Sequence, residues 1–111
     1  MINELVQRLC QGTHEVILED RNDSYEDIKY RIEDGYVHIT FTQTRGGTEL
    51  GINVDLNNTN VSSVDFDKKE GLLHIEGTTS LNYNLVKCVA DIDLRTNKGE
   101  GYLVILEEEQ I

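Results

Sequence analysis

The segment from Asp91 to Tyr102, DIDLRTNKGEGY, places carboxylates at a spacing that could bind calcium. An EF-hand loop has oxygen ligands at positions 1, 3 and 5, a glycine at position 6 and a bidentate glutamate at position 12. Asp91 and Asp93 fit the first two ligand positions. Arg95, however, brings a cation to the third, and Thr96 and Tyr102 replace the glycine and the glutamate. The segment therefore predicts a strand end and a hairpin turn, with both aspartates facing outward.

The three histidines, His14, His38 and His74, are the other candidates for metal binding. No two of them are spaced so that one helix or strand supplies two ligands, as zinc-binding motifs often do. His74 and Glu76 share one face of an expected strand, but a complete site would need distant strands to meet. The sequence predicts no metal and no other cofactor.

No motif for nucleophilic catalysis or phosphate binding is present. The stretch from Gly77 to Ser80, GTTS, lacks the G-x-S-x-G pattern of a nucleophile elbow. The stretch from Arg45 to Gly47, RGG, lacks the lysine and hydroxyl residue that end a P-loop. The sequence leaves enzymatic activity undecided and favours its absence.

The charge of the chain is strongly acidic: its 111 residues carry 21 acids and 10 bases, for a formal net charge of −11. Such a charge repels nucleic acid and anionic membrane surfaces, and it favours basic partners, cations or simple solubility. The start of the chain shows no secretory signal, and no apolar run is long enough for a membrane span. A cytoplasmic location is expected, where the two cysteines, Cys10 and Cys88, would be buried thiols.

Apolar residues near the start of the chain recur with the period of a helix. They predict an amphipathic helix over residues 1–11, which Gly12 is suited to end. A helix this short is marginal alone, so it must dock on the rest of the protein. The apolar set of this helix is Ile2, Leu5, Val6, Leu9 and Cys10.

After Gly12 the apolar period changes from that of a helix to that of a strand, which predicts antiparallel strands over residues 14–106. Tight turns separate these strands, and the last residues, 107–111, form an acidic tail. The expected strands include residues 28–32, 36–42, 48–56 and 61–67. In the long apolar segment 80–94 the buried face changes near Leu85 and Val86, which predicts a bulge.

One domain spanning residues 1–111 is expected from the length of the chain. The predicted fold is mainly β, or α+β by count: a short N-terminal helix followed by an antiparallel meander of about seven or eight strands. The meander closes into a barrel or packs as a sandwich, and the sequence leaves these two alternatives open.

The leading functional hypothesis is a non-enzymatic acidic module that binds a basic partner protein, with an inhibitor or nucleic-acid mimic as a special case. Residues 15–34 hold eight acids and three bases, and tyrosines in and beside this stretch add an aromatic component. Tyrosine is enriched at interface hot spots, and carboxylates supply charge complementarity. The predicted partner-binding residues are Glu19, Asp20, Asp23, Tyr25, Glu26, Asp27, Glu33 and Asp34.

Two alternatives stay open. One is a carrier or enzyme that binds a small ligand in the mouth of a β-barrel. The other is a homo-oligomer that buries its sheet edges, since no proline guards them. Neither direct nucleic-acid binding nor membrane binding is expected, because the charge opposes both. The residues expected in a ligand cavity are His38, His74, Tyr83 and Tyr102.

Overall fold

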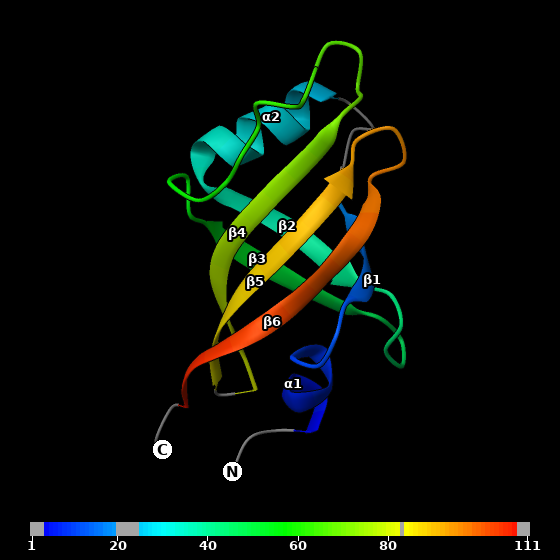
Figure 1. The fold of residues 1–111 in the computed structure, drawn as a ribbon. Coiled ribbons are helices and arrows are strands. Elements are labelled where there is room, and N and C mark those ends of the chain that lie inside the picture. Colours follow the sequence, from blue (N-terminus) through cyan, green and yellow to red (C-terminus); the bar gives the residue numbers. More distant parts are fainter. Residues whose placement is uncertain (1–3, 20–24, 83, 109–111) are drawn as a thin grey trace.

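Six antiparallel strands close into a barrel, which is capped by two helices (Figure 1). The computed structural model describes residues 4–19, 25–82 and 84–108. The mainly β prediction is confirmed, and the barrel is the alternative that the chain adopts, with six strands in place of seven or eight. In chain order the elements are α1 (Glu4–Leu9), β1 (His14–Leu18), α2 (Tyr25–Asp34), β2 (Tyr36–Phe41), β3 (Thr48–Val54), β4 (Leu72–Leu81), β5 (Asn84–Asp93) and β6 (Lys98–Glu108).

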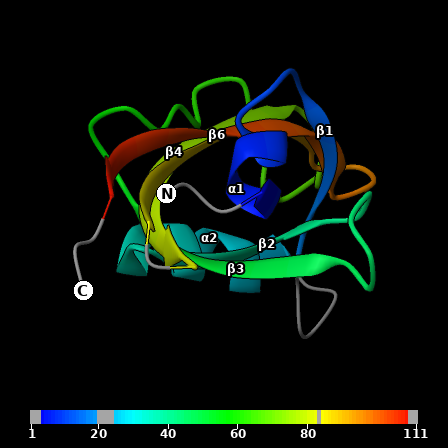
Figure 2. The ribbon, with the colours of Figure 1, turned by 90° about the horizontal axis from the view of Figure 1, so that it is seen from below.

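Strand β1 closes the barrel because it pairs with both β2 and β6. Val16 lies opposite Phe41 on one side and opposite Gly99 on the other. Figure 2 shows two curved walls on opposite sides of the barrel, with β4 and β6 in one wall and β2 and β3 in the other. Strand β5 belongs to the first wall, because it pairs with both β4 and β6. The seam between β3 and β4 is short, with Asn53 opposite Thr78 and Val54 opposite Gly77.

The interior of the barrel is filled by the inward side chains of all six strands. In β2, for example, Val37, Ile39 and Phe41 are buried and the residues between them face outward, as the alternation of the sequence predicts. Full burial of one such side chain contributes about 1.5–3 kcal/mol. The helices close the two ends: Val6 and Leu9 of α1 and Ile28 and Ile32 of α2 join the same core (Figures 1 and 2).

The expected strand at residues 28–32 is wrong, because this segment lies in the helix α2. Ile28 and Ile32 are buried, whereas Tyr30 is 71% exposed. A spacing of four residues puts two side chains on one face of either a helix or a strand, so the two isoleucines fit both. Tyr30 would share their face only in a strand. Burial of Ile28 and Ile32 over the end of the barrel selects the helix.

The predicted bulge near Leu85 and Val86 is confirmed, since the pairing of β5 with β6 shifts register between these residues. The chain also reverses just before the bulge, because Leu81 at the end of β4 is opposite Asn84 at the start of β5. Asn82 adopts a positive φ of 48°, a conformation that asparagine tolerates better than most residues. The segment 80–94 is therefore the end of one strand and most of the next.

Strand β3 ends at Val54, so the strand predicted over residues 48–56 is two residues too long. Leu56, which lies beyond the end of β3, is 56% exposed. The strand predicted over 61–67 is also wrong: this segment forms turns with one isolated bridge from Asp65 to Glu70.

The last strand, β6, extends to Glu108 and so includes the first two residues of the predicted acidic tail. In the described parts of the chain, neither helix is long and apolar enough to span a bilayer.

Candidate protein-interaction surface

Four ionisable side chains form a row across the outside of the barrel. Glu15 of β1 lies opposite Glu100 of β6, Glu100 lies opposite Asp91 of β5, and Asp91 lies opposite His74 of β4. All four face outward. Val16, Ile75 and Ile92, the chain neighbours of Glu15, His74 and Asp91 in that order, are buried in the core. Glu100 is exposed directly opposite Asp91. We call these four residues the acidic row, and the outer faces of β4, β5, β6 and β1 the charged wall.

The acidic row has an electrostatic cost, since like charges directly opposite one another on neighbouring strands destabilise a sheet. Glu15 is partly satisfied, because its carboxylate accepts a hydrogen bond of 2.8 Å from the Thr42 hydroxyl. Glu100 makes no hydrogen bond or ion pair with any described side chain. Glu100 therefore stands between two other carboxylates and is exposed to solvent.

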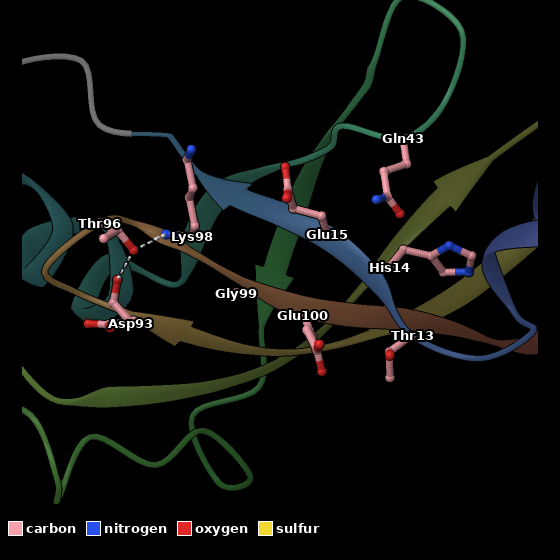
Figure 3. A pocket seen from close by; sticks show the side chains of 9 residues that line it. All are labelled: Thr13, His14, Glu15, Gln43, Asp93, Thr96, Lys98, Gly99 and Glu100. Carbon is pink, nitrogen blue, oxygen red and sulfur yellow. Dashed lines mark hydrogen bonds between the residues drawn. The ribbon is translucent and has the colours of Figure 1, made fainter.

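A hollow of about 520 Å³ lies over the β1 and β6 part of the charged wall. Figure 3 shows Glu15, Glu100 and Asp93 around it, from β1, β6 and the end of β5. Lys98 is the one lysine or arginine among the described residues that line this hollow. A second hollow of about 290 Å³ shares Lys98, Gly99 and Glu100 and adds Leu72 and Tyr102. The two hollows adjoin through these shared residues and form one depression, in which the charged side chains are four acids and one lysine.

At the β4 end of the acidic row, His74 is bound by two carboxylates. Its Nδ1 donates to Asp91 Oδ1 at 2.8 Å, and its Nε2 donates to Glu76 Oε2 at 2.6 Å. The other oxygen of Glu76 pairs with Lys87 Nζ at 2.7 Å. The hydrogen bonds that His74 donates to Glu76 and, to a smaller extent, to Asp91 raise the pKa of His74. The hydrogen bonds that Glu76 accepts from His74 and Lys87 lower the pKa of Glu76. The four side chains form a chain of alternating charge.

Of the predicted partner-binding residues, Glu19, Glu33 and Asp34 lie outside the charged wall. Glu19 follows β1 and accepts a 2.9 Å hydrogen bond from Thr40 of β2. Glu33 and Asp34 are exposed at the end of α2, at the opposite end of the barrel from α1 (Figure 1). Tyr25, Glu26 and Asp27 are in the first turn of α2, and Asp20 and Asp23 lie outside the described residues.

Of the four residues expected in a ligand cavity, the three that the structure describes lie on the outside of the barrel. His38 is on the outside of β2, His74 on the outside of β4 and Tyr102 on the outside of β6. Tyr83 lies outside the described residues. The described interior holds apolar side chains instead, from Val16 in β1 to Leu103 in β6.

The acidic row itself was not predicted. Alternation along each strand correctly places Asp91 on the outer face, and the same reasoning applies to Glu15. What alternation cannot supply is the register between strands far apart in the chain, which puts Glu15 beside Glu100. The one local signal is that His74 and Glu76 share a face.

The opposite side of the barrel has a different outer face. The outward residues of β2 are Tyr36, His38 and Thr40. Their partners on β3 are, in the same order, Asn53, Gly51 and Glu49. The rings of Tyr36 and His38 meet edge to face at 5.1 Å, and Tyr36 is 43% exposed. We call this surface the aromatic wall.

Neither cysteine has the lowered pKa that is typical of a reactive thiol. Cys88 is a buried free thiol, and burial raises its pKa to about 12, which disfavours the nucleophilic thiolate. Cys10 is also a free thiol, and its pKa is raised by burial. Among the residues that the structure describes, no group of three His, Cys, Asp or Glu side chains could hold a metal ion.

Comparison with known proteins gives one family match. No curated protein sequence matches the chain. The family described as core binding factor beta subunit matches residues 4–111, which include both helices and all six strands. A subunit acts by binding another polypeptide. The chain belongs to the core binding factor beta subunit family and is a protein-interaction subunit.

Proposed function

We propose that this chain is a non-enzymatic subunit that binds a basic partner protein through its charged wall. The observation that supports the proposal is the acidic row, in which Glu15, Glu100 and Asp91 occupy neighbouring positions on three strands. Such a row lowers the stability of the free protein. A basic partner would remove that repulsion, so binding can compensate for an arrangement that folding alone does not favour.

The overall charge is consistent with the same partner. With a net charge of −11, the chain opposes contact with nucleic acid and attracts basic surfaces. Interface charges of this kind steer the encounter and raise the association rate more than they raise the final affinity. The depression over Glu15, Glu100 and Asp93 gives lysine or arginine side chains of a partner a concave place to enter.

A matched pair of double variants tests the proposal. Glu15→Gln with Glu100→Gln removes two charges from the acidic row and keeps an oxygen that can accept the Thr42 hydrogen bond. Glu33→Gln with Glu49→Gln removes two exposed glutamates from α2 and the aromatic wall. Both variants therefore have the same net charge and the same chemistry of substitution.

The measurement is affinity for a protein partner captured from cell extract and then purified, at low and high salt. We expect the Glu15/Glu100 variant to bind about tenfold more weakly at low salt and to show a smaller salt dependence, since each lost ion pair contributes up to about 1 kcal/mol. The Glu33/Glu49 variant should stay near the wild type. Equal weakening of both variants would show that net charge, rather than the charged wall, drives binding. No change in either would contradict the electrostatic proposal.

A further inference from the structure

His74 occupies a position that controls the charge of the acidic row. Both of its ring nitrogens lie within hydrogen-bonding distance of a carboxylate oxygen, 2.8 Å for Asp91 and 2.6 Å for Glu76. An ionised carboxylate only accepts hydrogen bonds, and a neutral imidazole has one N–H donor. Both contacts can form together only when the ring carries two protons and a positive charge. The geometry therefore describes the imidazolium form.

The charged and titratable groups around His74 come from three strands. Glu76 lies on the same strand, Asp91 lies on β5, and Glu100 of β6 lies beyond Asp91 in the row. Lys87 of β5 reaches His74 only through Glu76. On the remaining side, the backbone of Asn60 exchanges two hydrogen bonds with the backbone of His74, at 2.9 and 3.2 Å, and contributes no charge.

The other two described histidines have no such surroundings. His14 Nε2 contacts the backbone carbonyl of Gln11 at 2.9 Å, and the ring of His38 meets Tyr36. Neither has a described carboxylate partner. Only His74 combines two carboxylates with membership of the acidic row, so a single proton on it changes the charge that a partner meets there.

We propose that His74 is a proton-operated switch for the acidic row, so that affinity for basic partners rises as pH rises through the neutral range. Below the transition, the imidazolium compensates the charge of Asp91. Above it, the proton goes to water, the ring keeps one N–H, and Asp91 joins Glu15 and Glu100 as an uncompensated charge. The same linkage means that binding a basic partner expels the proton from His74.

This inference rests on the proposed function of the charged wall. Two measurements distinguish a failure of the His74 switch from a failure of that proposed function. The first is an NMR titration of the histidine rings in the free, full-length chain. We expect the His74 transition above the ordinary value of 6.5, because both carboxylates favour its charged form. Asp91→Asn should lower this midpoint. A His74 midpoint at or below the ordinary value would overturn the switch, whatever the chain binds.

The second measurement is the affinity of a short oligo-arginine peptide at about pH 6 and at about pH 9, a range across which arginine keeps its charge. Wild-type protein should bind about two- to fivefold more tightly at the higher pH, the range for one exposed ion pair. His74→Gln should remove this difference. His14→Gln, which alters a histidine that lines the hollow, and His38→Gln on the aromatic wall should both retain it.

The outcomes are distinct. Absence of peptide binding at every pH contradicts the electrostatic function, while the NMR titration still decides the switch. Binding that is unaffected by pH, or a pH effect lost in His14→Gln rather than in His74→Gln, contradicts the switch and leaves the charged wall as the binding surface. If circular dichroism shows that His74→Gln does not fold, Asp91→Asn provides the same comparison of peptide affinity at the two pH values. This variant removes the Asp91 charge, which is uncompensated once His74 loses its proton.

Discussion

The charged wall and the aromatic wall have inner faces of the same kind and outer faces that differ. Both contribute apolar side chains to one core, such as Ile92 of β5 and Ile39 of β2. Outside, the first presents a row of ionisable residues, whereas the second presents Tyr36, His38 and one acid, Glu49. The core explains why the chain folds as a barrel. The difference between the outer faces is the part of the molecule that needs a functional explanation.

Glycines in the two walls make the sharpest structural contrast. A Cβ at Gly99 would overlap the backbone carbonyl of Asp91, because β5 and β6 approach closely there. A Cβ at Gly51 would overlap the hydroxyl end of Tyr36, whose side chain lies across that glycine. A side chain can change rotamer, but a paired backbone cannot move without disturbing the sheet.

The largest expected effect is on stability. Gly99→Ala should lower the free energy of unfolding by about 3 kcal/mol, the upper range for overpacking against a fixed neighbour. Gly51→Ala should change it by less than about 1 kcal/mol, since Tyr36 can swing away and alanine is better than glycine in a strand. Urea unfolding followed by circular dichroism measures both. Equal losses would show that Tyr36 is held as firmly as the backbone of β5.

The next effect concerns pH. Because the folded state raises the pKa of His74 above 6.5, its contribution to stability is fully present below that value and is lost as pH rises through the folded pKa. We expect the free energy of unfolding of wild type to exceed that of His74→Gln by at most about 1 kcal/mol at about pH 6, and we expect this difference to vanish near pH 9. His38→Gln on the aromatic wall is the control, and a pH-independent difference for His74→Gln would contradict the assignment.

A smaller effect should follow from relief of the repulsion. Glu100→Gln should raise stability by about 0.2–1 kcal/mol at low salt, because it removes the central charge of three. The gain should shrink in about 1 M salt, where exposed charges are screened over roughly 3 Å. Glu49→Gln, opposite the uncharged Thr40 on the aromatic wall, should give no comparable gain. A loss of stability in Glu100→Gln would mean that the row is not strained.

The smallest effect is expected from the aromatic wall in binding. Tyr36→Ala should leave the affinity for oligo-arginine within about twofold of wild type, because no charge of the acidic row is altered. Fluorescence anisotropy with a labelled peptide measures this. If Tyr36→Ala lost more affinity for oligo-arginine than Glu100→Gln, the result would show that the basic partner binds the aromatic wall rather than the charged wall.

Several parts of the fold could be predicted from local pattern alone. Alternation identifies the buried face of residues 36–42, and the change of parity identifies the bulge at Leu85 and Val86. The segment 28–32 could not be assigned this way, because the four-residue spacing of its isoleucines suits a helix and a strand equally. The prediction for residues 61–67 failed because two apolar residues of the same parity, Val64 and Phe66, also fit a chain of turns that packs against the core.

The amino-acid sequence by itself determined the mainly β architecture, the N-terminal helix, the net charge and the outward direction of Asp91, because each depends on composition or on contacts between near neighbours. The tertiary structure alone decided that α2 is a helix, since only the open end of the barrel offers its isoleucines a place to be buried. It also decided that Glu15, Glu100, Asp91 and His74 stand side by side. Register between distant strands depends on closure of the whole barrel, and closure is a property of no single segment.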